Sequence, residues 1–444
     1  MQATAVQTVL EAEPELKDFV PSSPNSLEEA GLTAGLVEQL VLKNLYFRGE
    51  ILGRDLGKAL GLNFSVIEPV IDFLKRSRLV EVKRSSGFGT VSSSFGLSDE
   101  GRSRAKEYLE TNQLVGPAPV PLEQYVEAVR RQRIKSGWAT QEKLRDALKH
   151  VVISDDYLTK IGPALNSFRS MLLYGKPGNG KTFLAEQLVH MEAEAIYIPY
   201  VVEAEGQFIK VFDSLYHRRV EAEPSALQQL TEESTFDQRW AKCKRPFLTT
   251  GGELTLDMLD LMYIPTAKIY DAPYQMKANN GIYLVDDFGR QQITPAELLN
   301  RWIYPLDGGV DFLRFQTGTK IQVPFECFLI FSSNLNPNDL GDEAFLRRLE
   351  YKLFMRNPPT DEFIQIFRDY CRDINIEYND DLVKYMIEKH YESCDRKYRR
   401  CHPRDVLRIA LDLMNFKSHP YSLTKALIDE AFDLKFVADN YTDE

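Results

Sequence analysis

The sequence has few of the features that mark membrane, secreted or nucleic-acid-coating proteins. Its five cysteines include no C-x-x-C pair, which is typical of a compartment where thiols stay reduced. No apolar run approaches the roughly 18 residues of a membrane span, and the acidic stretch at residues 11–15 is unlike a secretory signal. A formal net charge of -11 argues against a protein that mainly coats nucleic acid. We therefore expect a cytoplasmic, globular chain of two or three domains.

Standard metal-site spacings are also missing. Four side chains suit a tetrahedral zinc ion by type, namely His390, Cys394, Cys401 and His402. Their spacing matches no zinc pattern, so the sequence favours ordinary residues on helix faces over a metal site.

The sequence does contain a phosphate-binding motif. Residues 175–182 read G-K-P-G-N-G-K-T, which fits G-x-x-x-x-G-K-[ST], and they follow the apolar run at 171–174. Such glycines let successive backbone N–H groups point at phosphate oxygens. Lys181 is predicted to reach the β- and γ-phosphates, and Thr182 to offer a hydroxyl to Mg²⁺. The motif predicts that ATP and Mg²⁺ bind, with candidate contacts from Gly175, Pro177, Gly178, Asn179, Gly180, Lys181, Thr182 and Phe183.

A pair of carboxylates follows a second apolar run. Residues 282–285 suit a buried parallel strand, and Asp286 and Asp287 come directly after it, at the edge where such sheets bind ligands. Asp286 is predicted to hold Mg²⁺, and Asp287 to orient the attacking water. The alternative is an acidic strand-to-loop turn without a catalytic role.

Further along, an amide and three arginines occupy positions where they can meet phosphate. Asn334 follows the apolar run at 328–331 and can sense a γ-phosphate there. Arg347 or Arg348 can reach the nucleotide of a neighbouring subunit, and Arg404 lies at the start of a helix. For each arginine the alternative is a solvated charge or a structural ion pair.

The order of these parts resembles the AAA+ ATPases over residues 135–444. The resemblance implies a P-loop parallel sheet at 135–356 with a helical lid at 357–444. It further implies catalytic roles for Asp287 and Asn334, one of the two adjacent arginines as a finger acting in trans, and Arg404 as the sensor-2 arginine. The family usually has Glu where this chain has Asp287, whose carboxylate sits about 1.5 Å back. Since a misplaced base can reduce the rate on the order of a hundredfold, we expect slow hydrolysis.

Two alternating runs at 310–315 and 320–324 flank a glycine turn and predict a hairpin. Such a hairpin ahead of the sensor-1 strand resembles the pre-sensor-1 branch of AAA+ proteins, which includes MoxR-like chaperones, enhancer-binding activators and helicases.

The N-terminal part divides into a tail at 1–27, predicted to be mobile, and an ordered α+β region at 28–112. Three helices, two strand-like runs and a closing helix resemble a winged-helix domain. The second helix of its helix-turn-helix pair, which would begin at Asn63 or Ser65, carries Glu68 and Asp72. These carboxylates would repel a DNA backbone, so the sequence favours docking to a protein. Phe88, between two glycines, is the predicted partner anchor.

Residues 113–134 read as a proline-rich linker, extended and stiff, that leads into a helix. A second core strand is expected at 196–200, with an insertion of about eighty residues between it and Asp286. That insertion, which includes 244–252, is expected to line a pore or meet a client.

These features together predict an ATPase that assembles into a ring, a hexamer by resemblance, and remodels a protein client. The pairing of a winged helix with such a core faintly resembles bacterial pilus-assembly-associated chaperone ATPases. Two alternatives remain: a DNA-directed factor that grips duplex, and a nucleotide-gated scaffold with negligible hydrolysis.

Overall fold

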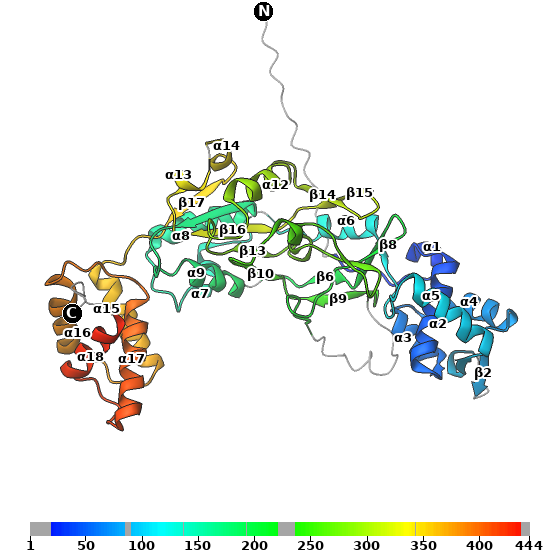
Figure 1. Ribbon diagram of the computed structural model, residues 1–444, viewed down its shortest axis with the longest axis horizontal. Coiled ribbons are helices and arrows are strands. Elements are labelled where there is room, and N and C mark those ends of the chain that lie inside the picture. The colour runs from blue at the N-terminus through cyan, green and yellow to red at the C-terminus, as the bar shows by residue number, and fades with distance from the viewer. Residues whose placement is uncertain are drawn as a thin grey trace, which may run out of the picture.

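The structure is a computed structural model that describes residues 19–84, 90–135, 137–191, 193–220, 236–341 and 343–436. The predicted anchor Phe88 and most of the predicted tail lie outside these residues. Figure 1 shows an elongated molecule with a parallel sheet in its middle. Helices α15–α18 lie at one end and helices α1–α5 at the other. No helix in the described ranges is both long and apolar enough to cross a bilayer.

The central sheet has five strands in the order β10-β13-β16-β5-β17, and all four pairings are parallel. Its faces are covered on both sides, which is why the three inner strands are nearly continuous buried runs. This confirms the predicted mixed α/β class with a parallel sheet. The strands are β5 (Ser170–Tyr174), β10 (Phe247–Thr250), β13 (Ile282–Val285), β16 (Phe328–Ser333) and β17 (Tyr351–Phe354).

Helices cover the two faces of this sheet. Leu144, Leu158 and Leu184 pack on one face, and Leu298 and Trp302 on the other. The helices and short turns around the sheet are α7 (Gln141–Ala147), α8 (Asp155–Ser167), α9 (Lys181–Gln187), η2 (Leu188–His190), η3 (Leu256–Leu259), α11 (Tyr274–Lys277), α12 (Pro295–Gly308), α13 (Pro337–Leu340) and α14 (Glu343–Leu346).

One strand assignment was wrong. The run expected as the second core strand forms β6 (Ile196–Pro199), which pairs antiparallel with β9 (Trp240–Cys243) outside the central sheet. The strand beside β13 is instead β10, from the segment that we had placed in the insertion. Because β10 is an edge strand, its residues alternate, with Leu248 and Thr250 buried and Thr249 exposed. It therefore reads as less apolar than β6.

The insertion forms its own sheet, in the order β11-β12-β8-β7-β4, called here the insertion sheet. Its last strand comes from the predicted linker, since Val120 and Pro121 pair in parallel with β7. Part of the segment predicted as a linker is thus a strand of this sheet. The elements are β4 (Val120–Pro121), α6 (Leu122–Arg131), β7 (Val201–Ala204), β8 (Gln207–Lys210), β11 (Met262–Ile264) and β12 (Ile269–Asp271).

The predicted hairpin is confirmed as β14 (Val310–Arg314) and β15 (Lys320–Pro324), paired antiparallel. Its buried face packs against the insertion sheet, where the Phe315 ring meets the Tyr270 ring edge-on at 4.9 Å. Its base is held by Arg301, which pairs with the buried Asp311 at 2.6 Å.

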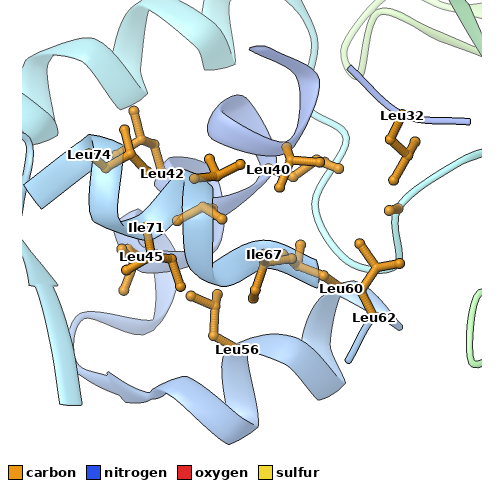
Figure 2. Close-up of a cluster of buried hydrophobic side chains, with 14 of the residues drawn as sticks. Leu32, Leu40, Leu42, Leu45, Leu56, Leu60, Leu62, Ile67, Ile71 and Leu74 are labelled. Carbon is orange, nitrogen blue, oxygen red and sulfur yellow. The ribbon is translucent and has the colours of Figure 1, made fainter. Parts of the chain in front are cut away.

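Helices α1–α5 and the small sheet β1-β3-β2 form the N-terminal body. Figure 2 shows leucine and isoleucine side chains of α2, α3 and α4 pointing toward one another. This core continues into Val201, Phe208 and Ile269 of the insertion sheet. The elements are α1 (Leu27–Ala30), α2 (Ala34–Arg48), β1 (Ile51–Leu52), α3 (Gly53–Leu60), α4 (Phe64–Arg76), β2 (Val80–Arg84), η1 (Thr90–Ser92), β3 (Ser94–Leu97) and α5 (Asp99–Thr111).

The C-terminal helical body has a separate apolar core, which includes Phe363, Met386 and Phe432. His390 stacks on Phe432 in this body, with ring centroids 4.1 Å apart. Its elements are α15 (Thr360–Asp373), α16 (Asp380–Ile387), the π-helical turn η4 (Glu388–Glu392), α17 (His402–Lys417) and α18 (Lys425–Lys435).

Candidate nucleotide-binding and catalytic site

The predicted site residues come together at one edge of the central sheet. Residues 175–182, called here the phosphate loop, connect β5 to α9. Asp286 and Asp287 follow β13, and Asn334 follows β16, the strand between β13 and β5. The carboxyl ends of parallel strands meet at a common edge, so the three segments converge where ligands of such sheets bind.

Two glycines of the phosphate loop have no room for a side chain. A Cβ on Gly175 would lie 2.5 Å from the Met355 carbonyl oxygen, and one on Gly178 would lie 2.5 Å from Cys401 Sγ. Both also have positive φ, 143° and 78° respectively, which other residues rarely adopt. The loop is therefore packed closely against the chain around it.

Lys181 is the centre of a hydrogen-bond network. Its Nζ donates to the Gly175 carbonyl at 3.0 Å and to Asn334 Oδ1 at 2.7 Å. Asn334 Nδ2 in turn donates to Asp287 Oδ1 at 2.8 Å. Burial lowers the pKa of Lys181, while the carboxylates of Asp286 and Asp287 act to raise it. Hydrogen bonds thus connect a cation, an amide and a carboxylate that come from three different segments of the chain.

Thr182 and Asp286 offer the oxygen atoms that a magnesium ion prefers. Thr182 Oγ1 donates to the two carboxylate oxygens of Asp286 at 3.0 and 2.9 Å. A hydroxyl and a carboxylate in contact are hard oxygen donors, and Mg²⁺ is commonly held through one or two carboxylates together with phosphate oxygens. These two residues therefore fit the predicted metal role.

Asp287 has an unusual backbone conformation, with φ 48°. Asp tolerates the left-handed region better than most residues. The turn is held by hydrogen bonds from Phe288 N to the Ser332 carbonyl at 2.7 Å and from Asp287 N to Asp286 Oδ1 at 2.9 Å. The exposed Asp287 side chain stands at the open edge of the sheet, where a water molecule can reach it.

The remaining residues of the loop differ in exposure. Pro177 is exposed, and Phe183 is 48% exposed. Asn179 is fully buried, and its Nδ2 donates to Asn357 Oδ1 at 2.9 Å and to the Met355 carbonyl at 3.3 Å. Its Oδ1 has no hydrogen-bond partner among the described residues. Asn179 therefore ties the loop to the segment after β17.

The two candidate finger arginines have different surroundings. Arg348 Nε pairs with Asp307 at the end of α12, at 3.0 Å. Arg347 is exposed on the surface beside α14. Of the two, Arg347 has the side chain that is accessible to another molecule.

Arg404 is not the arginine that the structure places on the phosphate loop. Its side chain is 61% exposed and pairs with the adjacent Asp405 at 3.2 Å. The turn just before α17, residues 398–401, reaches the loop instead, with Cys401 N donating to the Gly178 carbonyl at 2.9 Å. Sequence reasoning missed Arg399 and Asn357 here. The signal available was the pair of arginines just ahead of the helix-starting proline.

Comparisons with known proteins are distant. A model of a domain of unknown function, DUF8689, matches residues 359–434. No curated protein matches the sequence. Among solved structures, the RuvB Holliday junction branch migration motor of Thermotoga maritima is 14% identical, with a TM-score of 0.34, covering 70% of this chain and 76% of that one. NtrX of Brucella abortus is 13% identical, with a TM-score of 0.36, covering 74% of this chain and 62% of that one.

Proposed function

We propose that this chain is an AAA+ ATPase that binds Mg·ATP at the phosphate loop and couples its hydrolysis to the remodelling of a protein client. The observation that carries the proposal is the convergence of Lys181, Thr182, Asp286, Asp287 and Asn334 at one sheet edge, joined by hydrogen bonds. The division into a nucleotide-binding domain at 135–356, a lid at 357–444 and a winged helix at 28–112 belongs to the same proposal.

Each residue has a role that its position supports. Lys181 binds the β- and γ-phosphates, and Thr182 and Asp286 hold Mg²⁺, which neutralises phosphate charge when bound. Asp287 orients the attacking water, and Asn334 carries the position of the γ-phosphate to Asp287 through its amide. Because aspartate is shorter than the usual glutamate, turnover is slow.

The test is equilibrium binding of Mg·ATP and phosphate release by the full chain. Lys181→Ala is expected to weaken ATP binding at least about 10-fold and to abolish turnover, because the triphosphate loses its main cation. Lys160→Ala, which removes an exposed cation paired with Asp156 on α8, is the control and leaves both values unchanged. Wild-type ATP affinity in Lys181→Ala would refute the proposed site.

If an arginine of a neighbouring subunit completes each nucleotide site, the subunits must assemble side by side, as in a ring. Arg347 is the proposed finger because it is exposed, whereas Arg348 pairs with Asp307 in its own subunit. Arg347→Ala is expected to abolish turnover without changing ATP affinity, and mixing it with Lys181→Ala should restore part of the activity, since the two defects lie in different subunits. No restoration at any mixing ratio would contradict a finger in trans.

The N-terminal body favours a protein client over DNA. In helix-turn-helix proteins, the N-terminal residues of the second helix meet base edges. Here the turn that leads into α4 packs against another part of the chain, because Gly61 abuts the backbone of Gln238 and Arg239. Asn63 at the start of α4 is exposed, and its Nδ2 donates to Ser23 Oγ at 3.4 Å. A gel shift of the full chain at rising salt tests this point, since a steep salt dependence of duplex binding would favour the DNA-directed alternative.

A further inference from the structure

We propose that Arg399, rather than Arg404, is the arginine of the C-terminal body that binds the nucleotide phosphates in the same subunit. This inference rests on the proposed function and names a further residue of the same site. It makes the 398–401 turn the element through which the C-terminal body detects the nucleotide.

The 398–401 turn lies directly on the phosphate loop. Besides the hydrogen bond from Cys401 N to Gly178, the Arg399 Cβ is 3.7 Å from the position that a Cβ on Gly178 would take. Arg400 Cδ is 3.8 Å from the equivalent position on Gly180. The side chains of two successive arginines therefore lie beside two glycines of the phosphate loop.

Two asparagine side chains connect Arg399 to the phosphate loop by hydrogen bonds. The Arg399 guanidinium donates to Asn357 Oδ1, which also accepts from Asn179 Nδ2 at 2.9 Å. An arginine has five N–H donors in a fixed fork, so this bond orients the group and leaves donors for an anion. The buried Asn179 Oδ1, which has no partner among the described residues, lies in the same cluster.

The neighbouring arginines are engaged elsewhere. Arg400 donates to the Val152 carbonyl and pairs with Glu362, and both partners of that ion pair are only 11% exposed. It therefore fastens the 398–401 turn to the chain before α8. Arg404 pairs with Asp405, which also binds Lys435 at 2.7 Å. Only Arg399, of these three, is held through a neutral amide rather than a carboxylate.

The experiment compares ATP, tripolyphosphate and adenosine binding in three variants of the full chain. Arg399→Gln keeps a group that can donate to Asn357 but loses the charge, and it is expected to weaken ATP and tripolyphosphate binding about 10-fold while leaving adenosine binding unchanged. Arg399→Lys keeps the charge and is expected to retain more affinity than Arg399→Gln. Lys397→Ala removes an exposed cation of the same segment, paired with Asp395, and serves as the control.

The outcomes separate the inference from the function it rests on. If Arg399→Gln binds ATP as the wild type does while Lys181→Ala does not, Arg399 is not a phosphate ligand and the proposed ATPase stands. If Lys181→Ala also binds as the wild type does, the proposed function fails. An equal loss of adenosine and ATP binding in both Arg399 variants would show a structural role and overturn the inference.

Discussion

The two ends of the molecule are attached to the central part in different ways. The N-terminal body shares an apolar core with the insertion sheet, and the buried Arg239 side chain connects the two. The C-terminal body has its own core and meets the phosphate loop through a few polar contacts, such as Cys401 to Gly178 and Asn357 to Asn179. A shared apolar core resists separation, whereas a small polar interface can open and close with a ligand. The nucleotide is therefore expected to move the C-terminal body more than the N-terminal one.

The largest effect is expected from breaking the N-terminal attachment. Arg239 pairs with the buried Asp237 at 2.7 Å and donates to the carbonyls of Ala30 at 2.7 Å and Pro119 at 3.2 Å. Arg239→Ala leaves that carboxylate buried and unpaired, so it should lower the free energy of unfolding by about 3–5 kcal/mol. Urea denaturation measures this.

The exposed pair of Arg84 with Glu50 is the control, and Arg84→Ala should lower the free energy of unfolding by less than about 1 kcal/mol. Equal effects in the two variants would mean that the buried pair does not hold this interface.

A matched pair of glycines sharpens the comparison. A Cβ on Gly61 would lie 2.9 Å from backbone atoms of Gln238 and Arg239, whereas one on Gly178 would meet the Cys401 Sγ at 2.5 Å. Gly61→Ala should therefore destabilise the fold by about 2–4 kcal/mol, because a backbone cannot move aside easily. Gly178→Ala should lower the free energy of unfolding by only about 1–2 kcal/mol. It should nevertheless weaken ATP binding, because the new Cβ pushes the 398–401 turn away from the phosphate loop.

The double variant Gly178→Ala/Cys401→Ala tests the cause, since removal of the sulfur leaves a Cβ that is 3.7 Å away. It should recover part of the ATP affinity that Gly178→Ala loses. If it recovers none, the loss comes from the loop backbone itself and not from contact with the C-terminal body. Gly162→Ala, in α8 with no atom within 4 Å of its Cβ position, is the control. It should leave ATP affinity unchanged and raise the free energy of unfolding by up to about 1 kcal/mol, because Ala favours a helix more than Gly does.

A smaller effect, which depends on pH, is expected from a buried lysine of the N-terminal body. Lys43 is buried in α2, where burial lowers the pKa to about 8 from 10.5, and its Nζ donates to Asn112 Oδ1 at 2.7 Å. Since the folded state disfavours the charged form, the penalty is full below pH 8 and disappears as the pH rises past 10.5. Lys43→Met should raise stability at pH 7 on the order of 1–3 kcal/mol, with a gain that shrinks toward pH 10. Thermal unfolding from pH 7 to 10 measures this, and a gain independent of pH would contradict it.

Local patterns were enough to find most of the candidate site. The residues of the phosphate loop, Asp286 and Asn334 were identified because each directly follows an apolar run, and such runs become parallel strands whose ends meet. The hairpin β14–β15 was found for a similar reason, since two alternating runs around a glycine carry their own pairing information. These features depend on contacts between residues that are close in the sequence or on a general property of parallel sheets.

Other assignments depended on partners far along the chain. Whether Ile196–Pro199 or Phe247–Thr250 joins the central sheet is decided by which strand lies beside β13, and both runs are short and apolar enough for either place. The proline-rich segment becomes a strand only because β7 offers it an edge.

The sequence by itself was enough to predict the kind of ligand, from the motif at residues 175–182 and the acidic and amide residues after two later strands. That prediction is local because phosphate binding uses backbone groups that the glycines expose. The position of the 398–401 turn on the phosphate loop, and the contact of Gly61 with the backbone of Gln238 and Arg239, came from how the bodies at the two ends pack on the central part. Such docking depends on long-range shape and on single contacts, for instance Cys401 against Gly178, that no local pattern encodes.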